Sequence, residues 1–173
     1  MPRNAYASAP VARFMKPFFG GFATAALLVL SLLSGCATTY IPNTDVEDNT
    51  QNRTVIKFCE QYRHAVEEKN VGQLLKMASP AYHKRGIGTD DDVDFASLKD
   101  FLTTTFQTTD AIRYEIRYRR VTYADNAHVY VDYTYAASYR IPGVQKEEWR
   151  HSVADNRIDL VPEGESYKIL AGM

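Results

Sequence analysis

The residue whose surroundings most clearly prescribe a chemistry is the cysteine at position 36. It closes the tetrapeptide Leu33-Ser34-Gly35-Cys36, at the end of an almost entirely apolar run, residues 22–33. A cysteine thiol is a nucleophile that can take up a lipid chain. The small side chains of Ser34 and Gly35 let an extended backbone enter a narrow protease site.

The residues before Cys36 have the pattern of a targeting segment. Arg13 and Lys16 supply positive charge ahead of the apolar run. A membrane-spanning helix needs about 20 apolar residues, so this run is too short to span and suits the apolar centre of a signal peptide. The alternative is an ordinary apolar segment that ends in a cysteine. We expect residues 1–35 to be a signal peptide, with residues 1–14 an overlong start.

The tetrapeptide resembles the lipobox of bacterial lipoproteins. The resemblance implies that the Cys36 sulfur receives a diacylglyceryl group and that a signal peptidase cuts between Gly35 and Cys36. The new amino terminus would then be acylated, for example with palmitate. Ala37 follows the cysteine where aspartate would retain a Gram-negative lipoprotein in the inner membrane. We therefore expect anchoring in the cell envelope by lipid, at the outer membrane, with the polypeptide facing the periplasm or the outside.

Removal of residues 1–35 leaves an acidic chain, with 17 Lys and Arg against 21 Asp and Glu. This balance argues against binding to nucleic acid or to anionic lipid headgroups. Residues 36–52 are polar and rich in turn-forming types, which predicts a short tether. Residues 53–173 are long enough for one folded domain. Cys59 is expected to lie inert in its core.

Periodicity predicts three helices in the first half of this domain. Residues 53–69 place apolar side chains on one stripe at steps of four, three and four: Val55, Cys59, Tyr62 and Val66. A short helix is expected at 73–78, followed by a loop over 81–92. A third helix is expected at 95–108, with Asp94 as its N-cap.

Alternation of apolar and polar residues then predicts strands at 112–119, 128–135, 146–154 and 167–170, and residues 158–161 extend the third. Short turns separate these segments, so neighbouring strands are expected to run antiparallel. Helices followed by a meander of strands imply the α+β class, with the helices packed on one face of the sheet.

This outline resembles the nuclear-transport-factor-two-like cone, the fold of ketosteroid isomerase and scytalone dehydratase. The resemblance covers about 53–171 and is carried by the long first helix, its tight turn into a short second helix, and the tyrosine-rich strands. It implies a curved four-stranded antiparallel sheet wrapped around the first helix, with a pocket inside the cone. Residues 36–44 are also similar to an uncharacterised group of bacterial lipoproteins, which implies no activity.

Aromatic side chains dominate the expected interior of the cone. The candidate pocket residues are Tyr62, Tyr114, Tyr118, Tyr133, Tyr135 and Trp149. Their hydroxyl groups could orient a ligand, but filling the core is the favoured interpretation. A general base would need a carboxylate or imidazole inside the cone, and alternation places His128 and Asp132 on the other face. No catalytic residue can therefore be assigned.

Other candidate sites are weaker. The acidic residues of the 90–94 segment lack the glycine and glutamate of a calcium-binding loop, and the four histidines lack metal-ligand spacing. No metal or cofactor is expected. One strand face is basic and would suit an acidic partner, the alternative being an ordinary solvated face; its residues are Arg113, Arg117, Arg119 and Arg120.

Together these patterns favour a membrane-anchored envelope protein whose domain binds a protein or a ligand without catalysing a reaction. One alternative is a cone enzyme of the isomerase or hydratase type that uses pocket tyrosines. The other is a structural or assembly factor that acts as a homodimer through its sheet.

Overall fold

The computed structural model describes residues 38–86, 92–109, 111–124, 127–141 and 148–173. The signal peptide and modified cysteine expected within residues 1–37 lie outside this part. In chain order the elements are α2 (Thr50–Glu67), α3 (Val71–Met77), β1 (His83–Lys84), β2 (Val93–Asp94), α4 (Leu98–Gln107), β3 (Ala111–Tyr123), β4 (Val129–Ile141), β5 (Glu148–Glu163) and β6 (Ser166–Ala171).

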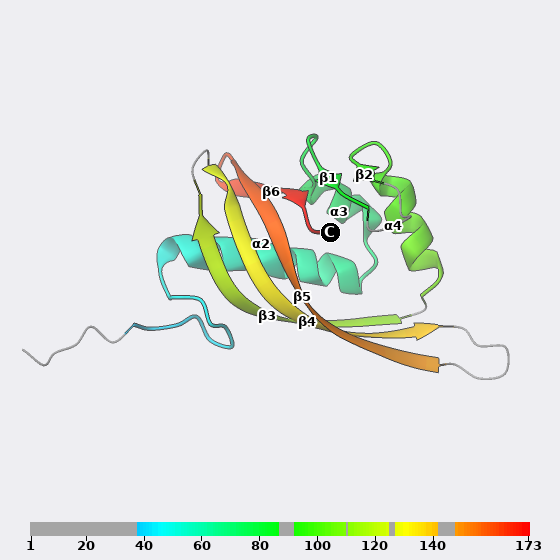
Figure 1. The fold of residues 1–173 in the computed structure, drawn as a ribbon, viewed down its shortest axis with the longest axis horizontal. Coiled ribbons are helices and arrows are strands. Elements are labelled where there is room, and N and C mark those ends of the chain that lie inside the picture. The colour runs from blue at the N-terminus through cyan, green and yellow to red at the C-terminus, as the bar shows by residue number, and fades with distance from the viewer. Residues whose placement is uncertain (1–37, 87–91, 110, 125–126, 142–147) are drawn as a thin grey trace, which may run out of the picture. The chain divides into compact units, whose positions relative to one another are not determined.

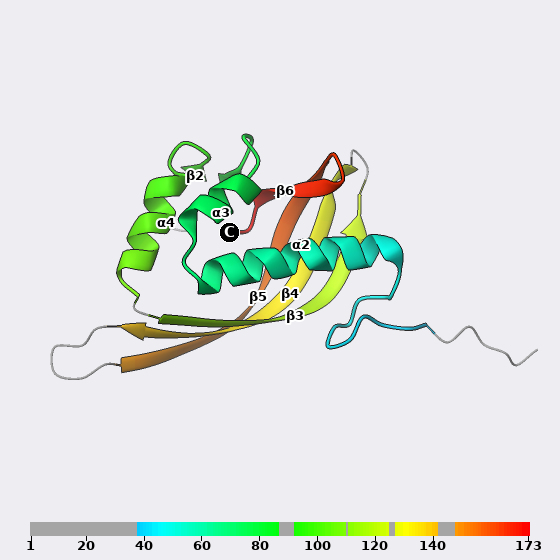
Figure 2. The ribbon, with the colours of Figure 1, turned by 180° about the vertical axis from the view of Figure 1, so that it is seen from behind.

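A four-stranded antiparallel sheet of order β3-β4-β5-β6 forms the main layer. The sheet bends around α2, which lies across its concave side, with α3 and α4 beside it (Figure 1). Figure 2 shows the same arrangement from behind, with α2 in front of the strands. The expected α+β architecture of helices packed on a curved four-stranded sheet is therefore confirmed.

Helix α2 begins three residues earlier than expected because Asn49 caps it. The Asn49 side chain accepts a hydrogen bond from the Asn52 backbone N–H at 2.8 Å. The predicted apolar stripe faces the sheet, where Val55, Cys59 and Tyr62 are buried. This stripe fixes which face of the helix packs on the strands.

The loop expected at 81–92 instead contains β1 and begins the approach to β2, which pairs with it antiparallel. Helix α4 begins at Leu98, not at residue 95. Asp94 caps a preceding turn, because its carboxylate accepts hydrogen bonds from the backbone N–H and hydroxyl of Ser97. The structure also joins the two expected parts of the third strand into one strand, β5.

Residues 38–49, which we call the arm, are not the free tether expected from their composition. A bridge between Tyr40 and Glu47 folds the arm back on itself, and Val46 is buried in the core. The Asp45 backbone N–H donates to the Tyr118 carbonyl of β3 at 2.9 Å. The arm therefore belongs to the compact unit Thr38–Met173.

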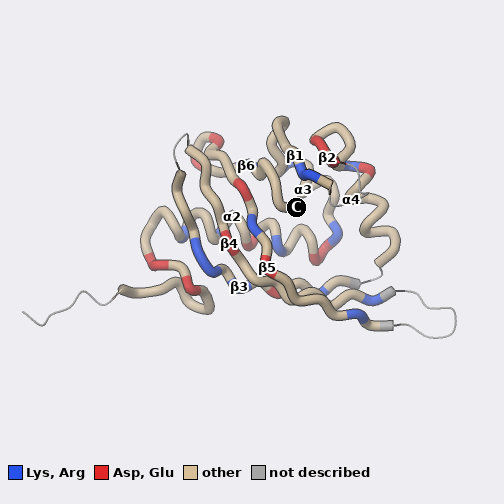
Figure 3. Tube along the Cα trace, viewed as in Figure 1, with Lys and Arg blue, Asp and Glu red and all other residues tan. Residues whose placement is uncertain are grey.

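Charges of both signs are spread along the helices and strands (Figure 3). None of the helices in the described part of the chain is both long and apolar enough to cross a membrane.

Candidate functional site

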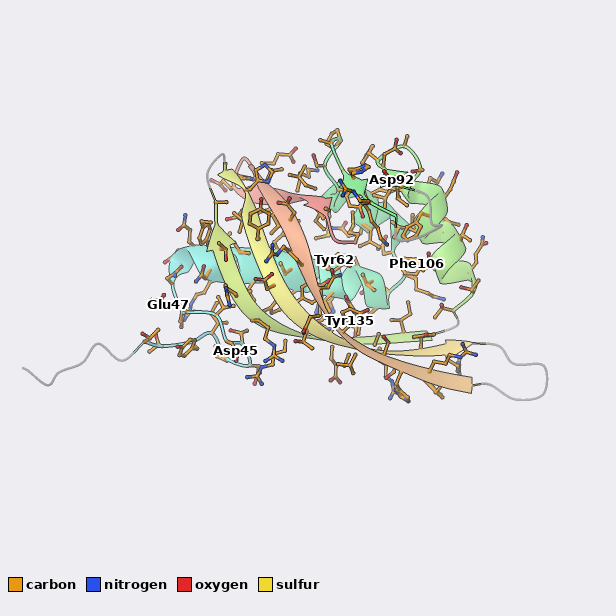
Figure 4. The ribbon with its side chains drawn as sticks, in the orientation of Figure 1. Asp45, Glu47, Tyr62, Asp92, Phe106 and Tyr135 are labelled. Atoms are coloured by element: carbon orange, nitrogen blue, oxygen red, sulfur yellow. The ribbon has the colours of Figure 1, made fainter. Side chains whose placement is uncertain are left out.

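Four of the candidate pocket residues meet in the core between α2 and the sheet. Tyr62 comes from α2, Tyr114 and Tyr118 from β3, and Tyr133 from β4; none is more than 8% exposed. Tyr135 is half-buried, and its ring centroid lies 5.5 Å from that of Tyr114. Figure 4 shows Tyr62 and Tyr135 on the concave side of the sheet. These rings fill the interior as core side chains do.

The buried Tyr114 and Tyr133 hydroxyl groups have hydrogen-bond partners within the protein. The Tyr133 hydroxyl lies 3.5 Å from that of Tyr114 and accepts a hydrogen bond from Asn156 Nδ2 at 2.9 Å. Burial raises the pKa of Tyr114 and of Tyr133, so both hydroxyl groups stay protonated near neutral pH. They can donate hydrogen bonds but cannot act as bases.

Trp149 does not join this cluster, so its inclusion in the pocket was wrong. Its side chain is 41% exposed, and the Arg113 guanidinium lies 5.2 Å from the centre of its ring. Ile158 and Leu160 of the same strand face the core, and the pairing of β5 with β4 has no register shift between Trp149 and Leu160. Side chains alternate along a strand, so the odd-numbered Trp149 must face outward.

The described core offers no general base. No Asp, Glu or His within the described ranges is buried, and the buried polar side chains there are Asn52 and Ser79. Burial raises the pKa of the Cys59 thiol, which disfavours the nucleophilic thiolate. His128 and Asp132 lie on the outer face, as alternation predicts, and pair with Asp159 and Arg157.

Two arginines of the basic face of β3 are paired with a carboxylate of the protein itself. Asp45 of the arm pairs with Arg117 at 2.6 Å and with Arg119 at 2.9 Å. These two guanidinium groups lower the pKa of Asp45 to about 2. Arg119 also donates to the hydroxyl of Thr134. An acidic partner would have to compete with this internal carboxylate.

A surface hollow of about 600 Å³ lies where the arm, α2 and β3 meet. We call it the edge groove; its lining residues are Ile41, Pro42, Asn43, Ile56, Glu60, Arg63, Glu115, Ile116 and Tyr118. Its volume is within the usual range of ligand-binding pockets. The floor is apolar and the rim is charged, so the groove can offer both contact area and directional bonds.

Side chains of α2 form a network beside this groove. Arg63 donates to Glu60 at 2.9 Å and to Glu67 at 2.7 Å. Glu60 also accepts a hydrogen bond from the buried Tyr118 hydroxyl at 2.8 Å. The pKa of Tyr118 is raised, first by burial, so this hydroxyl is a fixed donor. The network holds Glu60 at the rim of the groove.

Sequence reasoning missed the edge groove because each of its walls looked ordinary. Glu60, Arg63 and Glu67 resemble the solvated face of a helix, and residues 41–43 resemble part of a tether. The available signal was the i, i+3, i+7 spacing of three charges that can pair. The described residues contain no cluster of three metal-ligating side chains, and Asp90 and Asp91 of the acidic segment lie outside them.

No family model and no curated protein matches the chain. Solved structures do. A protein from Kribbella flavida has a TM-score of 0.61 at 12% identity, over 71% of this chain and 88% of that one. A proposed dehydratase of the NTF2-like family from Streptomyces avermitilis has a TM-score of 0.61 at 11% identity, over 72% and 95%.

A proposed scytalone dehydratase from Novosphingobium aromaticivorans is also similar, with a TM-score of 0.60 at 8% identity, over 70% of this chain and 80% of that one. At such identities the likeness concerns the fold alone. The chain therefore has the NTF2-like fold, and the resemblance expected from its sequence is confirmed at that level.

Proposed function

We propose that this protein is a lipid-anchored protein of the bacterial cell envelope whose domain binds a partner and catalyses no reaction. The lipid is attached at Cys36 after cleavage behind Gly35, and the anchor is in the outer membrane. The observation that carries the binding role is the tyrosine-filled core. The Tyr114, Tyr118 and Tyr133 hydroxyl groups of this core have hydrogen-bond partners within the protein, whereas the edge groove is open at the surface.

The anchor rests on the sequence alone. The charged start, the short apolar run and the Leu33-Ser34-Gly35-Cys36 motif together support lipid attachment. Two acyl chains already hold a protein stably at a bilayer, because each buried methylene contributes about 0.8 kcal/mol.

The anchor is tested by comparing Cys36→Ser with Ala37→Ser, which introduces the same residue one position later. Intact mass and membrane fractionation are measured for both. Cys36→Ser should lose the lipid mass and leave the membrane fraction, whereas Ala37→Ser should keep both. A Cys36→Ser protein with unchanged mass and fractionation would refute the anchor.

The binding role is tested by photo-crosslinking in cells, with the crosslinker placed at Glu115 in the edge groove or at Glu165 in the turn before β6. A partner identified by mass spectrometry should then bind the purified chain. A purified protein that turns over small carbonyl or hydroxyl substrates, with activity lost in Tyr133→Phe, would instead establish the cone-enzyme alternative.

One observation favours a homodimer as the second candidate. Val153 on the outer face of β5 is 71% exposed, and its cross-strand neighbour Ala136 is exposed as well. Together with Trp149 these residues place apolar surface where a second copy could pack. Sedimentation of the wild-type chain and of Val153→Lys tests this directly, because only a sheet-mediated dimer would dissociate in the variant.

A further inference from the structure

Strand β3 is an edge of the main sheet, and the described residues cover its outer side only in part. The Tyr114 backbone N–H donates to a carboxylate oxygen of Glu67 at 3.1 Å, away from β4. The Tyr118 carbonyl accepts from the Asp45 N–H, also on that side. Edge strands with unpaired backbone groups can pair with another chain, and native proteins usually cover them.

Ile116 lies midway between these two covered positions. Backbone groups of alternate residues in a strand point to the same side, so the N–H and C=O of Ile116 face the edge, as those of Tyr114 and Tyr118 do. The pairing of β3 with β4 has no irregularity between Tyr114 and Tyr118. Within the described residues, these two groups of Ile116 have no hydrogen-bond partner.

The open position coincides with the edge groove. Ile116 contributes to its floor, together with Ile41 of the arm and Ile56 of α2. A backbone donor and acceptor pair thus lies beside the apolar floor of a hollow on the protein surface. This combination fits an extended chain, whose own backbone would pair with Ile116 while one side chain enters the hollow.

We propose that the edge groove binds a short extended segment of a partner protein as an added strand, with a basic side chain directed to its acidic rim. This inference rests on the proposed binding function and names the partner's chemistry. The arm already shows the principle, because Asp45 of this chain bonds the next edge-facing carbonyl of β3.

The charge of the rim selects a basic segment. Glu60 and Glu115 are the two carboxylates that line the groove, and Arg63 is its one lining cation. The Arg63 guanidinium is already held by Glu60 and Glu67, and Glu115 has no ion-pair partner among the described residues. An incoming Lys or Arg would therefore meet an uncompensated carboxylate, whereas an acidic side chain would be repelled.

The charges around Glu115 do not cancel this preference. Arg117, two residues along β3, is paired with Asp45 of the arm. Arg113, two residues in the other direction, lies over the Trp149 ring. Both cations are thus directed to other groups on the outer face of the sheet.

The test uses the full chain in detergent and three capped peptides as probes: alternating Val and Lys, alternating Val and Glu, and the Val–Lys peptide with proline at every third position. The lysine peptide should bind about tenfold more tightly than the other two, and more weakly at high salt. Proline removes the backbone donors that a strand needs. On binding, hydrogen exchange of the Ile116 amide should slow about tenfold.

Two charge reversals provide matched variants. Glu115→Lys should lower the affinity for the lysine peptide three- to tenfold, which is roughly the contribution of one partly exposed ion pair. Glu165→Lys makes the same change in an exposed turn and should leave the affinity unchanged. Circular dichroism of both variants confirms that they are folded.

Equal binding of the three peptides, or binding that leaves Ile116 exchange unaltered, would overturn the inference. Failure of the lysine peptide to bind at about 1 mM would overturn it as well. Each of these results leaves the proposed function standing if Cys36→Ser loses its lipid and a partner crosslinks elsewhere. Different results would refute the proposed function: a Cys36→Ser protein of unaltered mass, and crosslinking that identifies no partner.

Discussion

Replacing Tyr133 by phenylalanine tests whether the buried hydroxyl groups serve the fold or a reaction. Tyr133 is 1% exposed, accepts from Asn156 at 2.9 Å and lies 3.5 Å from the Tyr114 hydroxyl. If these contacts are structural, Tyr133→Phe must destabilise the protein. A hydroxyl kept for catalysis at the expense of stability would give the opposite result, because active sites are often locally unfavourable for folding.

The expected loss follows from the contacts. Removing the hydroxyl deletes about 1 kcal/mol of net hydrogen bonding and leaves the buried Tyr114 hydroxyl with fewer partners, for a total of about 1–2 kcal/mol. In a folded unit of this size, 1 kcal/mol corresponds to roughly 3–5 °C in Tm. Tyr133→Ala also removes the ring and should cost about 4 kcal/mol.

Urea unfolding followed by circular dichroism measures these differences. Tyr130→Phe is the matched control, because Tyr130 lies on the outer face near Arg157 and should change stability by less than about 0.5 kcal/mol. Unchanged or increased stability of Tyr133→Phe would refute the structural interpretation of the tyrosine cluster.

Three further changes test other parts of the molecule. Gly172→Ala should lower the free energy of unfolding in urea by about 2–4 kcal/mol, because φ is 96° and a Cβ would lie 2.1 Å from a β5 carbonyl oxygen. The control is Gly164→Ala, where φ is 60° and the space around the Cβ is open, and it should lower this free energy by only about 1 kcal/mol. Pairing with two guanidinium groups of β3 lowers the pKa of Asp45 from 3.8 to about 2. The stabilisation by these ion pairs is therefore present above pH 3.8 and is lost as the pH falls toward 2. Hydrogen-exchange protection of the Val46 amide should fall over this pH range, and constant protection would count against the docked arm. Burial raises the pKa of Tyr82 from 10.0 to about 12. The stabilisation by the neutral Tyr82 side chain is therefore complete below pH 10 and is lost as the pH rises to 12. Tyr82→Phe should lose less Tm than the wild type between pH 10 and 12, and an equal loss would contradict the raised pKa of Tyr82.

The sequence was sufficient for the elements whose patterns are local. The stripe containing Val55, Cys59 and Tyr62 identified α2 and its buried face, and the alternation along β3 and β4 placed Tyr114, Tyr118 and Tyr133 inside. Each prediction depended only on the period of the side chains, which the backbone geometry fixes.

Features that depend on distant residues could not be predicted in this way. The sequence of the arm looks like a tether because its docking contacts are distant in the chain. Asp45 pairs with Arg117 and Arg119, which lie more than 70 residues away. The edge groove is formed by three such segments. The position of Trp149 could have been predicted. Side chains alternate along a strand, and Trp149 lies an odd number of residues from the inward-facing Ile158 of β5, so it must face outward.

The docked arm has a mechanical consequence for a chain anchored at Cys36. The Thr39 carbonyl is already bonded to the Asp48 N–H, so only residues 37 and 38 lie between Cys36 and the body, and Cys36 can lie at most about 11 Å from Thr39. So short a connection would keep the folded unit close to the lipid headgroups. Because Ile41 and Pro42 also line the edge groove, a strand that binds there would have to approach close to the plane of the bilayer. If the proposed anchor is correct, protein segments that emerge directly from the same membrane would reach the groove most easily.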